Sequence, residues 1–181
     1  RDTDADDFCA GGPASVENLY INAIGVAPVD LSCITAIAGS LEIENSITSS
    51  IDLSNVTWVD DEVNIHDNDD LEFVDLTSLI SIGNYFYLSS NGDLSELNMS
   101  SLVDVGGWVT INSNSSLDLV DFSSLTSIDG EFQINNNYSL DDLTTPLLEE
   151  IVGDFRIDGN ETLDEVSAPS LNDVSGQIYV Y

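Results

Sequence analysis

The hydrophobic positions of the chain recur with a 23-residue period, most clearly in VTINSNSSLDLVDF (109–122) and FQINNNYSLDDLTT (132–145). Two approximate 22-residue units open the series, five 23-residue units follow without a gap, and a partial unit comes last: 13–34, 35–56, 57–79, 80–102, 103–125, 126–148, 149–171 and 172–181. A period of this length over several units indicates a solenoid, in which each unit is one coil stacked on the next. Residues 1–12 precede the repeat, and we expect them to form an N-terminal arm or cap.

Six positions of the unit, counted from residue 57, are apolar in nearly every coil: 3, 7, 9, 15, 18 and 23. Positions 7 and 9 hold β-branched, aromatic or leucine residues around one polar residue, which is the pattern of a half-buried strand. No stretch keeps the 3.6-residue period of a helix. We therefore predict an all-β, parallel β-solenoid with a strand at positions 6–10 of each coil. The glycine that recurs at position 5 predicts a turn with positive φ before this strand.

Position 12 is asparagine in all five full units, where its amide can satisfy backbone groups of its own and neighbouring coils. These residues are Asn68, Asn91, Asn114, Asn137 and Asn160. The frame I-x-G-x-hydrophobic-x-I-x-x-N-x-x-L, as in SIDGEFQINNNYSL (127–140) and EIVGDFRIDGNETL (150–163), resembles the receptor L-domain family with its leucine-rich-repeat-like coils. Within that family it is most similar to fungal GPI-anchored proteins of cell-wall organisation. The resemblance covers residues 13–181 and implies a right-handed solenoid at a cell surface or in a cell wall.

The charge balance restricts the partners. The chain has 34 Asp and Glu against two Arg or Lys, a formal net charge of −32. Such a surface repels nucleic acid and attracts cations or basic partners. Carboxylates recur at positions 16 and 17 (Glu72, Asp118, Asp141, Asp164; Glu96, Asp142, Glu165) and would repel one another across adjacent coils. Because no loop has the spacing of a calcium-binding motif, we expect no cofactor and no specific metal site, only diffuse calcium binding.

Several features are typical of a secreted protein. Cys9 and Cys33 are the two cysteines, and we predict a disulfide that ties the N-terminal arm over the open end of the core. Five Asn-x-Ser/Thr sequons occur, and we favour glycosylation at Asn55 and Asn98, which lie between apolar columns. The sequons at Asn114, Asn137 and Asn160 coincide with the structural asparagine column. No apolar run reaches the roughly 18 residues of a membrane span, so we expect no direct membrane insertion.

Aromatic residues gather at the outward positions of the predicted strand: Tyr85, Tyr87, Trp108, Tyr179 and Tyr181. They predict a contact surface for a sugar or a partner protein. The alternative is an aromatic ladder that only stabilises the sheet. The last coil stops within its strand, which indicates either a fragment of a longer chain or an end that docks onto another subunit.

No catalytic constellation is evident. The only histidine, His66, lies beside Asp67 at an outer position, and the units carry no insertion that would form a cleft. We therefore predict a secreted, non-enzymatic structural glycoprotein of a cell surface, cell wall or extracellular assembly that associates end to end. The alternative is a recognition module that binds carbohydrate or protein through the aromatic face.

Overall fold

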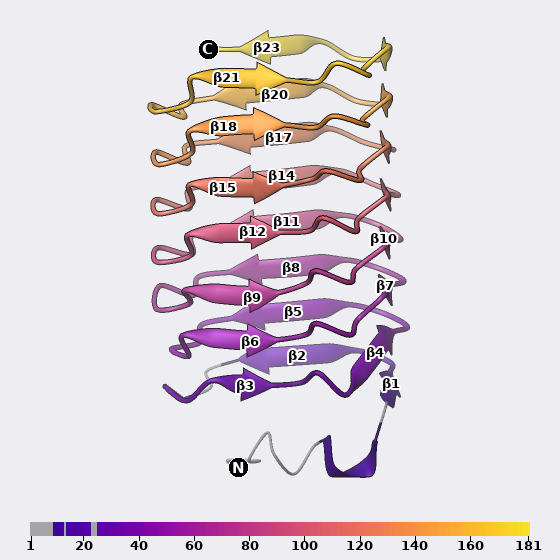
Figure 1. Cartoon of the computed structure of the whole chain (residues 1–181), viewed down its shortest axis with the longest axis vertical. Coiled ribbons are helices and arrows are strands. Elements are labelled where there is room, and N and C mark those ends of the chain that lie inside the picture. Colours follow the sequence, from indigo (N-terminus) through magenta and orange to yellow (C-terminus); the bar gives the residue numbers. More distant parts are fainter. Residues whose placement is uncertain (1–8, 13, 23–24) are drawn as a thin grey trace.

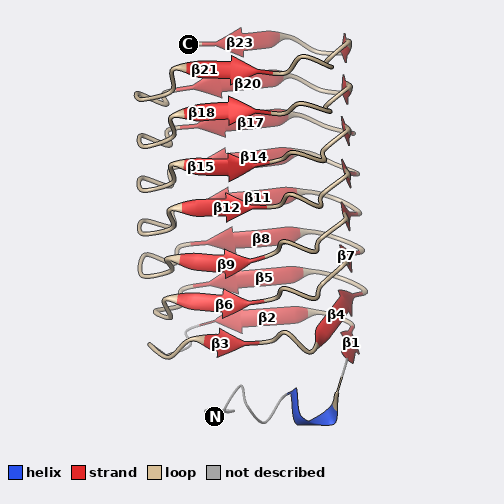
Figure 2. Ribbon diagram, viewed as in Figure 1, coloured by secondary structure: helices blue, strands red, loops and turns tan. Residues whose placement is uncertain are grey.

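The computed structural model describes residues 9–12, 14–22 and 25–181, and the chain in these residues forms one β-solenoid. In Figure 1 the chain rises coil by coil from the N-terminus to the C-terminus, with front strands running to the right and rear strands to the left. This sense makes the solenoid right-handed. Figure 2 shows that the only helix within the described ranges is the single turn η1 (Cys9–Gly11) near the N-terminus.

Each coil contributes a strand to one continuous eight-stranded sheet, which we call the main sheet. Its strands, at the rear in Figure 1, are β2 (Leu19–Asn22), β5 (Leu41–Glu44), β8 (Val63–His66), β11 (Phe86–Ser89), β14 (Val109–Asn112), β17 (Phe132–Asn135), β20 (Phe155–Asp158) and the shorter β23 (Ile178–Val180). All neighbours pair in parallel, and the paired residues are 22 apart in the first coils and 23 apart thereafter. The predicted parallel solenoid and its 23-residue coil are confirmed.

Shorter strands form the other two faces of the solenoid. A second eight-stranded sheet contains β1 (Ala14–Val16), β4 (Ile34–Ile37), β7 (Trp58–Val59), β10 (Ser81–Ile82), β13 (Asp104–Val105), β16 (Ser127–Ile128), β19 (Glu150–Ile151) and β22 (Asp173–Val174). The third face carries two smaller sheets, β3 (Val29–Asp30), β6 (Ser50–Asp52) and β9 (Phe73–Asp75), then β12 (Glu96–Asn98), β15 (Leu119–Asp121), β18 (Asp142–Thr144) and β21 (Glu165–Ser167).

One hydrophobic core runs through the solenoid and is lined by the six predicted apolar columns. A seventh column, at position 20 of the unit, is also buried and was missed by the sequence analysis: Leu76, Met99 and Phe122 are fully buried there. The Phe132 and Phe155 rings stack between coils with centroids 5.3 Å apart. Because each coil covers the apolar residues of the next, the core depends on stacking rather than on any single coil.

The asparagines at position 12 form a hydrogen-bonded ladder, which we call the asparagine ladder. In each step the Oδ1 atom of one asparagine accepts from the backbone N–H and from Nδ2 of the asparagine one coil earlier, as Asn114 does from Asn91 (3.1 and 3.0 Å). The Nδ2 atom of Asn114 also lies 3.2 Å from the carbonyl oxygens of Leu88 and Asn112. Asn68, Asn91, Asn114 and Asn137 are completely buried.

The glycine column at position 5 has a different cause from the predicted one. None of its members adopts positive φ. A Cβ atom on Gly130 would lie 2.7 Å from the Trp108 nitrogen of the preceding coil, so the glycine permits close approach of two backbones. Positive φ occurs instead at position 11, just before the asparagine ladder, at Asp67, Ser90, Ser113, Asn136 and Gly159.

The predicted disulfide is present: Cys9 and Cys33 are bonded, with Cα atoms 5.4 Å apart. It joins η1 to the end of the first coil, and the closed loop of 24 residues contributes about 3 kcal/mol by the chain-entropy account. The rest of the predicted arm, residues 1–8, lies outside the described residues. In the part of the chain that the structure describes, no helix has the length and apolar character needed to cross a membrane.

Candidate functional site

The outer face of the main sheet carries an aromatic cluster, which consists of Tyr85, Tyr87 and Trp108. Tyr87 lies in β11, and Tyr85 and Trp108 immediately precede β11 and β14. The Tyr85 and Trp108 rings stack with centroids 4.2 Å apart and planes 3° apart, and the Tyr87 ring meets Trp108 edge to face at 6.0 Å. Trp108 is 36% exposed, so the cluster is open to solvent.

Carboxylates surround this cluster on the side of the earlier coils. Burial raises the pKa of Tyr85, and the negative charges of Glu62, Asp61 and Glu42 raise it further. Burial also raises the pKa of Glu62, with a further contribution from Asp61. The region therefore combines polarisable rings with a negative potential, which suits a cation.

The two remaining tyrosines of the predicted contact surface lie apart from the aromatic cluster. Tyr179 and Tyr181 are in and after β23, three coils beyond Trp108, with centroids 6.2 Å apart. The guanidinium of Arg156 lies 5.5 Å from the centroid of the Tyr179 ring. Within the described ranges Arg156 forms no ion pair within 4.0 Å. Its guanidinium lies over the Tyr179 ring instead. The aromatic residues therefore form two patches rather than one surface.

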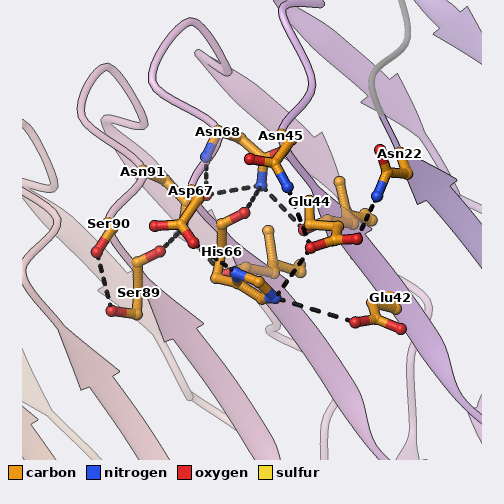
Figure 3. A network of polar contacts seen from close by, with 12 residues as sticks. Asn22, Glu42, Glu44, Asn45, His66, Asp67, Asn68, Ser89, Ser90 and Asn91 are labelled. Atoms are coloured by element: carbon orange, nitrogen blue, oxygen red, sulfur yellow. Dashed lines mark hydrogen bonds and ion pairs between the residues drawn. The ribbon is translucent and has the colours of Figure 1, made fainter.

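His66 belongs to a polar cluster that the sequence analysis did not predict (Figure 3). Its Nε2 atom lies 4.0 Å from Glu42 Oε1 and 3.9 Å from Glu44 Oε2, and its Nδ1 atom lies 2.9 Å from Asp67 Oδ2. Glu42 and Glu44 come from β5, one coil before His66. The 22-residue register between β5 and β8 places Glu44 directly beside His66. The repeat units also give both residues the same position, 10, but the sequence analysis did not compare this column for metal ligands.

The carboxylates at positions 16 and 17 do not converge into a site. Asp142 and Glu165 are register neighbours, and six of the seven acidic side chains in these positions are exposed, with Glu96 half-buried. In the described part of the chain, the only group of three potential metal ligands whose atoms lie within 4.8 Å of one another is Glu42, Glu44 and His66. The sequence analysis considered only the repeated carboxylate columns and did not identify the group of Glu42, Glu44 and His66.

A shallow hollow of about 340 Å³ lies on the third face beside Asp30, Asp52 and Asp75. These aspartates are register neighbours, but each accepts hydrogen bonds within its own turn, as Asp30 Oδ1 does from the N–H (3.0 Å) and the hydroxyl (2.6 Å) of Ser32. The hydrogen bonds from Ser32 lower the pKa of Asp30. Each of these carboxylates thus closes its own turn through Oδ1.

The five sequons fall into two groups. Asn55 is exposed and its Nδ2 donates to the carbonyl of Ser32, while Asn98 is half-buried and its Oδ1 accepts from Ser100 N–H. By contrast, the Nδ2 atoms of Asn114, Asn137 and Asn160 are hydrogen-bonded inside the asparagine ladder. Because a glycan is attached at Nδ2, modification of these three residues is incompatible with the folded chain.

No protein-family model, curated protein or solved structure matches this chain.

Proposed function

We propose that the protein is a non-enzymatic scaffold of a cell surface, cell wall or extracellular assembly that binds a positively charged protein partner through the aromatic cluster. The observation that carries the proposal is the stacked Tyr85–Trp108 pair on the open face of the main sheet, flanked by Asp61 and Glu62. Lys and Arg side chains are attracted both by the ring faces of such a cluster and by the carboxylates beside it.

The charges beside the rings favour a basic protein segment over a neutral sugar as the partner. One face of Tyr85 and one face of Trp108 are taken up by their mutual stack, and Asp61 and Glu62 attract a cation toward the faces that remain. Tyr and Trp at the centre of an exposed patch are typical anchors of protein interfaces. Among protein partners, the net charge of −32 favours one with a basic segment.

An extracellular location is part of the proposal and is supported by the Cys9–Cys33 disulfide, since such bonds persist in oxidising compartments. The resemblance to cell-surface L-domain proteins points the same way, as do the accessible sequons at Asn55 and Asn98.

The test compares two tryptophan variants of equal charge. Trp108→Ala removes the anchor, whereas Trp58→Ala removes a tryptophan that is 46% exposed on the second sheet. Binding of a fluorescently labelled peptide of alternating Arg and Gly is measured by anisotropy at physiological ionic strength. We expect Trp108→Ala to weaken binding about tenfold, the effect of a typical anchor residue, and Trp58→Ala to leave it unchanged. Equal affinity of both variants would show that only diffuse charge attraction operates.

End-to-end association is a second candidate function, and a specific observation favours it. Ile178 and Val180 occupy the positions that are buried in the inner coils, yet they are 60% and 55% exposed in β23, which pairs on one side only. A further coil on that edge, from a continuing chain or a second copy, would cover them.

Sedimentation velocity over a range of concentrations, with and without millimolar calcium, tests this association. Association through β23 predicts larger species that the double variant Ile178→Glu, Val180→Glu abolishes. The matched control is Val26→Glu, Ile47→Glu, because both residues are exposed elsewhere on the solenoid. A single monomeric species at all concentrations would rule out end-to-end association of this chain.

A further inference from the structure

The cluster around His66 has the layout of a metal centre. β5 and β8 are adjacent parallel strands, and their outward positions pair Glu42 with Asn64 and Glu44 with His66. Four side chains with nitrogen or oxygen ligand atoms therefore stand at the corners of one small rectangle on the outer face of the main sheet. In the described part of the chain, no other group of three His, Cys, Asp or Glu side chains has its ligand atoms within 4.8 Å of one another.

We propose that Glu42, Glu44 and His66 bind a divalent transition-metal ion such as Zn²⁺. The His66 Nε2 atom and one oxygen of each glutamate lie within 4.8 Å of one another. Tetrahedral Zn²⁺ with bonds of about 2.0–2.1 Å requires ligand atoms roughly 3.3 Å apart. Side-chain rotations that shorten the 3.9 and 4.0 Å distances by about 0.6 Å meet this requirement.

The surroundings of the cluster orient its ligands. Asp67 Oδ2 accepts a hydrogen bond from Nδ1 of His66 at 2.9 Å, which leaves the lone pair of Nε2 directed toward the two glutamates. A carboxylate behind a histidine is the usual partner that fixes the tautomer of a metal ligand. Asn22 and Asn45 donate to the two oxygens of Glu44 and hold its carboxylate in place.

Two further observations point to a cation rather than to a purely structural cluster. Glu42 and Glu44 hold their oxygens close together, and this repulsion is relieved by a bound positive charge. Asn64 Oδ1, beside Glu42 in the register, is buried and is one of two such side-chain oxygens in the described residues that have no hydrogen-bond partner. In the proposed site, a water of the bound ion would supply that partner.

The histidine nitrogen determines which ion is preferred. Calcium and magnesium take oxygen ligands, whereas imidazole together with carboxylate suits Zn²⁺ and its neighbours. We expect the acidic surface to bind Ca²⁺ diffusely, so millimolar Ca²⁺ should occupy the nonspecific positions without competing strongly at His66.

The test is a calorimetric titration of the disulfide-bonded chain with ZnCl₂ in the presence of millimolar CaCl₂. We expect one Zn²⁺ per chain, with affinity at least tenfold weaker in His66→Gln and in Glu44→Gln. Glu161→Gln removes the same charge from an exposed position far along the chain and serves as the control for Glu44→Gln, with unchanged affinity expected. Apo-protein melting temperatures establish that each variant is folded.

Asp67 acts as a positioning residue, and its role has a separate readout. Because His66 is the only histidine, its ¹⁵N resonances report the tautomer without ambiguity. Asp67→Asn should weaken Zn²⁺ binding about tenfold and change the tautomer ratio of the apo protein. Zn²⁺ binding that survives His66→Gln, or the absence of any Zn²⁺ signal above the Ca²⁺ background, would overturn the proposal. In the latter case the cluster is a polar surface contact between His66 and three carboxylates.

Discussion

At the scale of single residues, the asparagine ladder explains why one residue type recurs at position 12. Each side chain must donate to carbonyl oxygens of its own coil and of the preceding coil, and accept from the asparagine of that preceding coil. Aspartate offers no donor, and leucine offers neither donor nor acceptor. Serine stands at this place in the second coil, where the N–H of Ser46 donates to Asn68 Oδ1 and begins the ladder.

Asn114→Ala tests the ladder where it has a neighbour on both sides. The substitution leaves the N–H of Asn91 without an acceptor inside the core and removes one of the three acceptors of its Nδ2, so we expect a loss of about 3 kcal/mol in the free energy of unfolding. Urea denaturation followed by circular dichroism measures this loss. The control is Asn172→Ala at an exposed position, expected to change stability by less than about 0.5 kcal/mol. A comparable small effect at Asn114 would mean that water replaces the ladder bonds.

The asparagine ladder was predictable because one residue type repeats at one position. The left-handed backbone at position 11 was not predictable from the sequence. Asp67, Ser90 and Gly159 share a positive φ but are three different residue types, so no residue pattern marks this position. The His66 cluster was not predicted either, because it involves one pair of coils only and therefore leaves no repeated pattern in the sequence.

At the scale of the element, each coil is the repeating structural unit and also the sequence repeat from which its strands were predicted. The main-sheet strands were predicted nearly to the residue, because two apolar columns flank one polar position. The strands of the third face, such as β12, contain a single buried residue between polar ones, which a sequence pattern cannot distinguish from a turn. Their strand character comes from pairing with the next coil, not from their own residues.

Deletion of one whole coil, residues 103–125, should leave a folded solenoid. The junction places Thr126 after Leu102 and restores the register, because the deleted segment has the length of one repeat. Since 23 of 181 residues are removed, we expect the urea m-value to fall by about 13% and the circular dichroism per residue to remain unchanged.

Deletion of 103–114 provides the contrasting case. It removes about half a coil and brings outward residues to inward positions, so we expect loss of the cooperative transition. If both deletions behave alike, stacking in register is not what determines the fold.

At the scale of the whole molecule, self-repulsion is the main electrostatic feature. Asp173 pairs in register with Glu150, and Asp142 with Glu165, so like charges stand one strand apart on two faces. Positive charge is too scarce to compensate, because the chain holds two Lys or Arg in 181 residues. The solenoid is thus stabilised by its core and ladder against a surface that opposes compaction.

The pH dependence of stability follows from the shifted pKa values of three carboxyl groups, those of Glu62, Asp104 and Asp30. Burial raises the pKa of Glu62 above its ordinary value of 4.5, with Asp61 adding to the effect, and burial also raises the pKa of Asp104 above 3.8, with Asp129 adding to the effect. A raised pKa means that the folded state binds the proton more readily than the unfolded state. These two groups therefore destabilise the fold at neutral pH, and acidification toward their ordinary values relieves the effect.

We accordingly expect the melting temperature to rise as the pH falls from 7 toward 4.5 and then to decline at lower pH. The decline arises because hydrogen bonds from Ser32 lower the pKa of Asp30, whose stabilising contribution is lost as the pH falls through that lowered pKa. Glu62→Gln and Asp104→Asn should each raise the melting temperature at pH 7 and flatten the rise. Differential scanning calorimetry in the His66→Gln background isolates the carboxyl groups from the single histidine. A melting temperature that falls steadily from pH 7 downward would show that favourable carboxylate contacts outweigh repulsion on this surface.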